Sequence, residues 1–264
     1  MFGGEVTQVA IFVILVFAVP WIVGPWLPQQ PSNRWEAIAS FVPGVWAPTF
    51  IAIMMIGWTA GWPGLRRELK ARLRYASGAG GWLIVAVSAP ALVTLTGVVA
   101  ARMGGKEQPF IPAAAVGDVV VNALVTGAVG EEFGWRGFVL SRLDRRLDPP
   151  TAALVMAALW TLWHLPIFLF PDSPYSTWPL IPALLTLLSF GVFMGSLFYR
   201  GEGSVLPTIL AHLTLNVSLA IGGAPLSSPV LWWTAAVAYS VLAWRIFQRG
   251  DPVRAARTCN DAKT

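Results

Sequence analysis

Hydrophobic residues fall in eight long runs along the chain, and turn-rich or charged breaks separate these runs. A helix needs about twenty mostly apolar residues to cross a bilayer, and each run comes close to that length. The predicted spans are Val6 to Val23, Ala37 to Ala60, Trp82 to Ala101, Val116 to Leu140, Ala152 to Phe170, Leu180 to Tyr199, Val205 to Ile221, and Val230 to Phe247. The pattern therefore predicts an all-α, polytopic membrane protein with about eight transmembrane helices. We expect residues 1–250 to form a single transmembrane domain and residues 251–264 to form a solvated C-terminal tail.

The basic residues between the spans alternate from one side to the other. If the amino terminus is cytoplasmic, most of the 18 basic residues fall in inner loops, and only Arg34, Arg102 and Lys106 fall in outer ones. Cytoplasmic loops carry an excess of Lys and Arg, so both termini are predicted in the cytoplasm of a multi-pass plasma-membrane protein. The largest basic cluster, Arg66 to Arg74, includes Leu65, Leu69 and Leu73 at helical spacing. This spacing is typical of an amphipathic helix that contacts anionic lipid.

Composition excludes several classes of protein. The chain is 56% hydrophobic and 12% charged, whereas soluble domains carry about a quarter charged residues. A single cysteine, Cys259, excludes a disulfide scaffold. The net charge of +5 comes from short clusters between apolar runs, which indicates membrane lipids as partners and excludes nucleic acid. The oligomeric state is left open.

A few ionisable or strongly polar residues lie inside the predicted spans. Each charge in hydrocarbon costs roughly 2.5 to 3.5 kcal/mol on insertion scales, so such residues indicate a functional site. They are Glu131, Glu132 and Arg136 in the fourth span, His164 in the fifth, and His212 and Asn216 in the seventh. At a rise of about 1.5 Å per residue, four of them fall in the middle band of the membrane: Glu131, His164, His212 and Asn216. Three helices are therefore expected to bring them together.

Helical spacing separates the roles of the two carboxylates. Glu132 and Arg136 are four residues apart and share a helix face, so they are expected to form an ion pair. Glu131 is rotated by about 100° from Glu132 and points elsewhere. One carboxylate is thus neutralised and the other is free.

The same spacing groups the polar residues of the other two spans. His212 and Asn216 present an imidazole and an amide to one spot, and Trp160 lies one turn before His164, where its ring shelters the imidazole. Small residues let neighbouring backbones approach closely in membranes. The fourth span has glycines at positions 127, 130, 134 and 137, so neighbouring helices are expected to approach its backbone closely.

The residues of these spans resemble a known family. Glu131 to Arg136 match the E-E-x-x-x-R motif of the CAAX-protease and bacteriocin-processing (CPBP, or Abi) intramembrane endopeptidases. His164 falls in the second motif, F-x-x-x-H, and His212 to Asn216 match the last motif, H-x-x-x-N. The resemblance covers residues 116–222, with one departure, because a tryptophan at position 160 stands where the family usually has Phe.

The resemblance implies an eight-helix enzyme that hydrolyses a peptide bond of a membrane-associated peptide or protein. In eukaryotic members the bond follows a prenylated cysteine, but a lipidated substrate is not carried over to this chain. Glu131 would be the general base and, with His164, would hold the attacking water. Desolvation at mid-membrane makes a carboxylate a stronger base, as this role requires. His212 and Asn216 would stabilise the oxyanion of the tetrahedral intermediate.

The resemblance also implies roles for the ion pair and raises the question of a metal. Glu132 with Arg136 would position the helix. Zinc is the alternative to a metal-free mechanism, with Glu131, His164 and His212 as its ligands. The chain has no H-E-x-x-H sequence, and each ligand would come from a different helix. A glutamate-dependent mechanism without a cofactor is therefore favoured.

Three other interpretations remain open from the sequence. The polar residues can form a purely structural network between helices. They can line a Glu- and His-containing path in a transporter, although no inverted repeat is visible. The chain can also be a catalytically silent membrane scaffold or immunity factor, which the family resemblance allows.

Overall fold

The structure is a computed structural model that describes residues 4–23, 34–75, 80–105, 111–169 and 175–249. The described residues are mostly helical, with turns and short irregular segments between the helices, and they contain no strand. The main helices are α1 (Glu5–Val23), α2 (Arg34–Arg72), α3 (Gly80–Met103), α7 (Pro149–Leu169), α8 (Leu180–Arg200), α9 (Leu206–Ile221) and α10 (Pro229–Gln248). The predicted fourth span is a continuous helical stretch built from η2 (Ala113–Ala115), α4 (Val116–Ala123), η3 (Leu124–Ala128), α5 (Val129–Glu132), η4 (Phe133–Leu140) and α6 (Ser141–Leu143).

The lengths and hydropathies of these helices fit an integral membrane protein. Six of the helical stretches within the described residues are long and apolar enough to cross a bilayer, and Glu5–Val19 and Leu206–Ile221 are shorter apolar helices. The predicted all-α, membrane-spanning class is confirmed, and each predicted span coincides with a helix. The count of eight crossings and the single domain stay predictions, while residues 251–264 lie outside the described residues.

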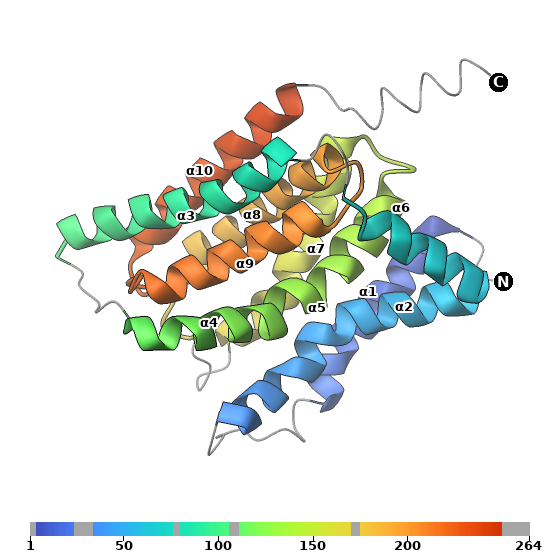
Figure 1. The fold of residues 1–264 in the computed structure, drawn as a ribbon, viewed down its shortest axis with the longest axis horizontal. Helices are drawn as coiled ribbons and strands as arrows, with labels where there is room; N and C mark the ends of the chain where they lie inside the picture. Colours follow the sequence, from blue (N-terminus) through green and yellow to red (C-terminus); the bar gives the residue numbers. More distant parts are fainter. Residues whose placement is uncertain (1–3, 24–33, 76–79, 106–110, 170–174, 250–264) are drawn as a thin grey trace.

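The second helix continues beyond its predicted end. The predicted span stops at Ala60, but α2 turns at Gly61, which has φ +63°, and continues to Arg72 (Figure 1). Glycine adopts this left-handed backbone conformation without steric cost. The helix predicted over the basic cluster is present, but its leucines do not all face lipid. Leu65 is buried and Leu69 packs against the protein core, whereas the contact of this helix with anionic lipid stays a prediction.

The fourth span is not the regular α-helix that the sequence pattern predicted. Two π-helical segments, η3 and η4, flank the short α5 segment. Each π-turn takes in an extra residue, and such turns are frequent at functional sites. The irregular segments lie on either side of the two glutamates.

Several loops and helix ends that carry basic residues lie at one end of the helix bundle. Arg145 at the end of the fourth span pairs with Glu5 at the start of α1, with 2.6 Å between Nη1 and Oε1. Arg200 at the end of α8 donates to the carbonyl of Ile246 near the end of α10, over 2.7 Å. Figure 1 shows these helix ends on the same side of the molecule. The structure thus groups the ends predicted to share one side of the membrane, while their cytoplasmic orientation stays a prediction.

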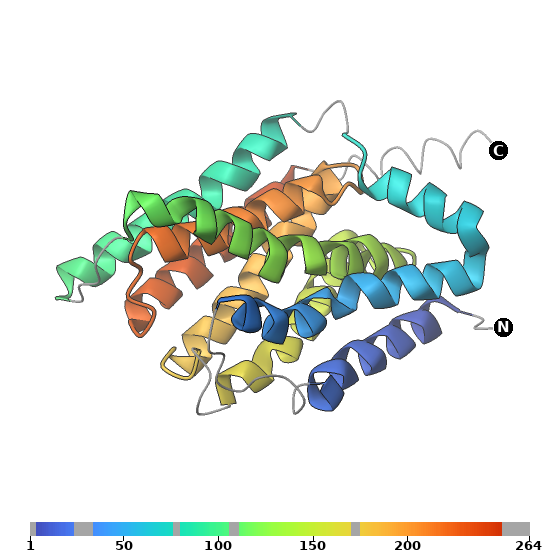
Figure 2. The same cartoon turned by 60° about the horizontal axis from the view of Figure 1, so that its bottom comes forward.

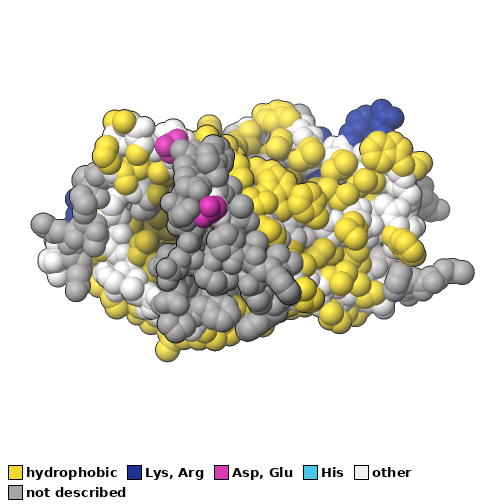
Figure 3. All heavy atoms as spheres, turned by 90° about the horizontal axis from the view of Figure 1, so that it is seen from below, with side chains coloured by type: hydrophobic (Ala, Val, Ile, Leu, Met, Phe, Trp, Pro, Cys, Tyr) yellow, Lys and Arg dark blue, Asp and Glu magenta, His cyan; other side chains and the backbone are white. Residues whose placement is uncertain are grey.

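Helix α8 lies in the interior of the bundle and packs against α7, α9 and α10 (Figure 2). By contrast, the exterior carries large apolar side chains, such as Trp58, Met54 and Ile84, which are 82%, 70% and 69% exposed. The face in Figure 3 is covered by hydrophobic side chains over most of its described surface. A surface of this kind is suited to the hydrocarbon of a bilayer.

Candidate active site

The polar residues predicted within the spans meet where three helical stretches come together. They are Glu131, Glu132 and Arg136 on α5 and η4, Trp160 and His164 on α7, and His212 and Asn216 on α9. Five of these seven residues are at most 5% exposed, and the other two are partly buried. Electrostatic interactions are strong in such a buried setting.

Glu132 is held by two partners. Arg136 Nη1 donates a hydrogen bond to Glu132 Oε1 over 2.9 Å, and both side chains are fully buried. His212 Nδ1 lies 2.9 Å from the same oxygen. The ion pair expected from the i,i+4 spacing is present, and His212 is a further partner that spacing within one helix did not indicate. Glu132 is therefore engaged in holding α9 against the fourth span.

Glu131 lies in a different environment, although it is the next residue in the chain. The indole Nε1 of Trp160 donates a hydrogen bond to Glu131 Oε2 over 2.7 Å. Within the described part of the chain, Glu131 forms no ion pair. A desolvated carboxylate that accepts from a neutral donor retains its capacity to act as a base.

The hydrogen bonds of the two histidines define which ring nitrogens remain available. His164 Nδ1 lies 2.8 Å from the backbone carbonyl of Trp160. Because a carbonyl oxygen only accepts, this Nδ1 carries the proton, and Nε2 of the neutral ring is an acceptor. His212 Nδ1 likewise donates to the Glu132 carboxylate. Its Nε2 can donate only when the ring carries both protons, with Glu132 as the counter-ion.

Asn216 and His212 direct polar atoms toward the same point of the fourth span. A methyl group added to Gly127 would lie 2.8 Å from Asn216 Nδ2 and 3.6 Å from His212 Nε2. The shared face predicted for these two residues is therefore turned toward η3. The missing side chain at position 127 leaves room beside both polar atoms.

Trp160 touches more of the site than its sequence position suggested. Its ring centroid lies 4.6 Å from that of His164 and 5.7 Å from that of His212. The Arg136 guanidinium lies over the indole, 4.8 Å from the ring centroid. Helical spacing predicted only that Trp160 shelters His164, and it did not indicate the hydrogen bond to Glu131. A buried indole N–H usually has an acceptor, and this requirement was the signal that could have revealed it.

The backbone around the glutamates is shaped by its neighbours. Thr126 in η3 departs from helical geometry, with φ −100° and ψ 24°. Beyond the two glutamates in the chain, Gly134 lies directly against Pro48 of α2, where a Cβ would overlap the proline carbonyl. Helix α2 can therefore pack against the backbone of the E-E-x-x-x-R motif, as we expected from the glycines in this span.

The zinc interpretation fits the described residues poorly. Glu131 Oε2 accepts from the indole of Trp160, and both histidines use Nδ1 for other partners, so only Glu131 Oε1 and the two Nε2 atoms would be available to a metal. Among the residues that the structure describes, no group of three or more His, Cys, Asp or Glu side chains is arranged to hold a metal ion. We therefore derive no chemical step from a metal.

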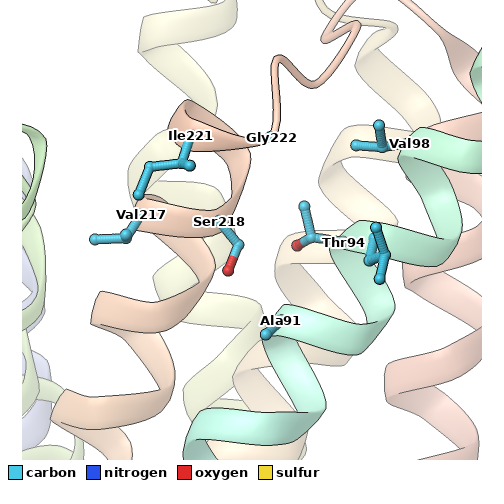
Figure 4. A pocket seen from close by; sticks show the side chains of 8 residues that line it. Ala91, Thr94, Val98, Val217, Ser218, Ile221 and Gly222 are labelled. Atoms are coloured by element: carbon cyan, nitrogen blue, oxygen red, sulfur yellow. The ribbon is translucent and has the colours of Figure 1, made fainter. Parts of the chain in front are cut away.

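A cleft of about 220 Å³ lies between α3 and α9, on another face of α9 (Figure 4). Thr94 lines it from α3, and Ser218 and Ile221 line it from α9. Ser218 and Ile221 are about 120° and 180° around the helix from His212, at 100° per residue. The cleft is thus separated from the candidate site by α9 itself.

Comparison with known proteins agrees with the motif resemblance. The family model described as type II CAAX prenyl endopeptidase Rce1-like matches residues 112–218. A relative from Methanococcus maripaludis, described as CAAX prenyl protease 2, is 26% identical over 106 residues. The aligned segment covers 38% of this chain and 39% of the relative, so the chain matches about two fifths of that relative's length. These matches support the family resemblance that the motifs indicate over this part of the chain.

Proposed function

We propose that the chain is an intramembrane endopeptidase of the CPBP family, which its motifs resemble and which the matches over residues 112–218 support. It hydrolyses a peptide bond of a membrane-associated peptide or protein. The general character of a CAAX-type protease follows from the family. The residues that carry the reaction, the substrate and the plasma-membrane location are our proposals.

One observation supports this proposal most strongly: two adjacent buried carboxylates have different partners. Glu132 is neutralised by Arg136 and His212, while Glu131 accepts a hydrogen bond from the uncharged indole of Trp160. A purely structural network would be served by two neutralised carboxylates. A general base instead requires one carboxylate that is not paired with a cation.

The reaction begins with a water molecule held between Glu131 and Nε2 of His164. Glu131 takes a proton from this water as the oxygen attacks the carbonyl carbon of the peptide bond. The carbonyl π electrons move to oxygen, which becomes an oxyanion. The oxyanion then collapses to a carbonyl while Glu131 gives its proton to the departing nitrogen, so the carbon–nitrogen bond breaks and yields a carboxylic acid and an amine, which then exchange a proton to become a carboxylate and an ammonium group.

The oxyanion is stabilised from the side of α9. Asn216 Nδ2 and Nε2 of the doubly protonated His212 donate hydrogen bonds to it, in the space that Gly127 leaves open. One such donor contributes about 3 to 4 kcal/mol to transition-state stabilisation. The hydrogen bond from His212 Nδ1 to Glu132 holds the ring in place for this role.

We propose that no metal or other cofactor takes part. Among the described residues, no group of three or more His, Cys, Asp or Glu side chains is arranged to hold a metal ion, and a carboxylate base with two hydrogen-bond donors is sufficient for peptide hydrolysis. Membrane lipids surround the protein, and the substrate reaches the site from within or beside the bilayer.

The test compares membranes that contain the wild-type protein with membranes that contain Glu131→Gln. Quantitative proteomics of peptide termini is expected to find at least one new terminus that only the wild type produces. Glu202→Gln is the matched control, because Glu202 is an exposed glutamate paired with Arg74. This control is expected to produce the same terminus as the wild type.

The outcomes separate the candidate functions. A terminus present with wild type and Glu202→Gln but absent with Glu131→Gln supports the protease. Identical termini in all three membranes, at equal protein levels, would contradict it and favour the silent scaffold or the transporter. Ion flux in proteoliposomes that depends on Glu131 would then identify the transporter.

A further inference from the structure

Trp160 contacts both the proposed base, Glu131, and the imidazole of His164. Its indole Nε1 donates to Glu131 Oε2 over 2.7 Å, while its backbone carbonyl accepts from His164 Nδ1 over 2.8 Å. The side chain is 1% exposed. The two groups that share the attacking water are therefore held by one residue.

The indole itself is fixed on several sides. The Arg136 guanidinium lies over its face, and the rings of His164 and His212 pack edge-on against it at interplanar angles of 76° and 86°. A ring held in this way cannot rotate its N–H away from Glu131 without displacing its neighbours. The hydrogen bond is therefore directed by packing.

The direction of this bond distinguishes the two oxygens of Glu131. Oε2 accepts from the indole, whereas Oε1 has no hydrogen-bond partner among the described residues. A carboxylate without such a donor could rotate about its terminal torsion, which is broad and roughly two-fold. Fixing Oε2 leaves Oε1 in a defined position to receive a proton.

We propose that Trp160 is a positioning residue, whose indole N–H holds Oε2 of Glu131 so that Oε1 faces the water held by His164. The inference rests on the proposed protease function, and it adds a role that an aromatic ring alone cannot perform. Phenylalanine would supply the same backbone carbonyl and a similar ring, but no donor. The chain's departure from the family motif at this position thus has a chemical consequence.

Two substitutions at position 160 test the donor separately from the ring. Trp160→Phe keeps an aromatic ring, and site-specific incorporation of 3-benzothienylalanine keeps the bicyclic shape while sulfur replaces the N–H. Each is assayed with a synthetic peptide that spans the cleavage site found in the proteomic comparison. Loss of a hydrogen bond to a charged acceptor predicts a fall in kcat of about 10- to 100-fold, with KM unchanged and with no greater loss of stability than Trp232→Phe causes.

Two further proteins complete the comparison. Site-specific 5-fluorotryptophan at position 160 retains the N–H and is expected to keep kcat within a few-fold of the wild type. Trp232→Phe is the matched control, because Trp232 Nε1 donates to the carbonyl of Leu226 over 2.7 Å and is 2% exposed, outside the site. It removes a comparable buried indole bond and is expected to leave kcat unchanged.

The results distinguish this inference from the function on which it rests. Wild-type kcat in the benzothienylalanine protein would overturn the positioning role, even if Glu131→Gln is inactive. Equal losses of kcat in the Trp160 and Trp232 variants would also overturn it, because the effect would then be general destabilisation. Full activity of Glu131→Gln would instead contradict the proposed protease mechanism itself.

Discussion

Two Glu–Arg pairs at i,i+4 spacing allow the energetic role of the buried ion pair to be measured. Glu132 and Arg136 lie 2.9 Å apart and are both 0% exposed. Glu68 and Arg72 lie 3.3 Å apart, and their side chains are 22% and 17% exposed. The pairs share sequence spacing and chemistry but differ in burial. Glu132→Gln and Glu68→Gln therefore compare the same change in two environments.

The expected magnitudes follow from burial. Glu132→Gln removes the carboxylate that Arg136 and His212 share, and it leaves a fully buried guanidinium without this counter-ion. Breaking a buried pair in this way costs about 3 to 5 kcal/mol. The partly exposed pair contributes about 0 to 1 kcal/mol, so Glu68→Gln is expected to cost little. The difference between the two variants should thus be at least about 2 kcal/mol.

The assay is reversible unfolding in mixed micelles, with the free energy of unfolding measured for each variant. The double variant Glu132→Gln/Arg136→Met removes both charges and is expected to recover part of the loss, because no uncompensated guanidinium remains. The reasoning is refuted if Glu132→Gln costs no more than Glu68→Gln. It is also refuted if the double variant is less stable than the sum of the two single changes predicts.

Three further predictions concern the site and its packing. Gly127→Ala places a methyl group 2.8 Å from Asn216 Nδ2, so kcat for peptide cleavage should fall about 100-fold because an oxyanion donor is displaced. An unchanged kcat would contradict the role of Asn216. Gly134→Ala forces a Cβ into the carbonyl of Pro48, so the free energy of unfolding should drop by about 1 to 3 kcal/mol. The control is Gly117→Ala, because a Cβ at that position meets nothing within 4 Å. Dialysis against a chelator should leave the cleavage rate unchanged, and a loss of rate that added zinc restores would contradict the metal-free mechanism.

The helices were predictable because the bilayer limits what the chain can do. Spanning segments must be long, apolar and internally hydrogen-bonded, so the hydrophobic runs indicated where the helices lie. The break after Ala60 was also visible in the sequence, since Gly61 and Pro63 interrupt the run there. The continuation of α2 as far as Arg72 depends on packing against the protein, as the burial of Leu65 shows.

Contacts within one helix were predictable, whereas contacts between helices were not. The Glu132–Arg136 pair follows from the i,i+4 spacing alone. The bonds from His212 to Glu132 and from Trp160 to Glu131 cross between helices, over 80 and 29 residues of sequence. Helical spacing gives the face on which a side chain lies, but not the partner that another helix presents. The π-helical turns around the glutamates were missed for the same reason, because tertiary packing decides where a helix takes in an extra residue.

The most direct test of the account is the rate of peptide cleavage by purified protein in proteoliposomes, compared between wild type and Glu131→Gln. The peptide is the one defined by the proteomic comparison, and its binding is measured separately for both proteins. The account predicts that Glu131→Gln binds the peptide with similar affinity and loses at least about 100-fold in kcat, because the general base is absent. Cleavage by Glu131→Gln at the wild-type rate would contradict the account.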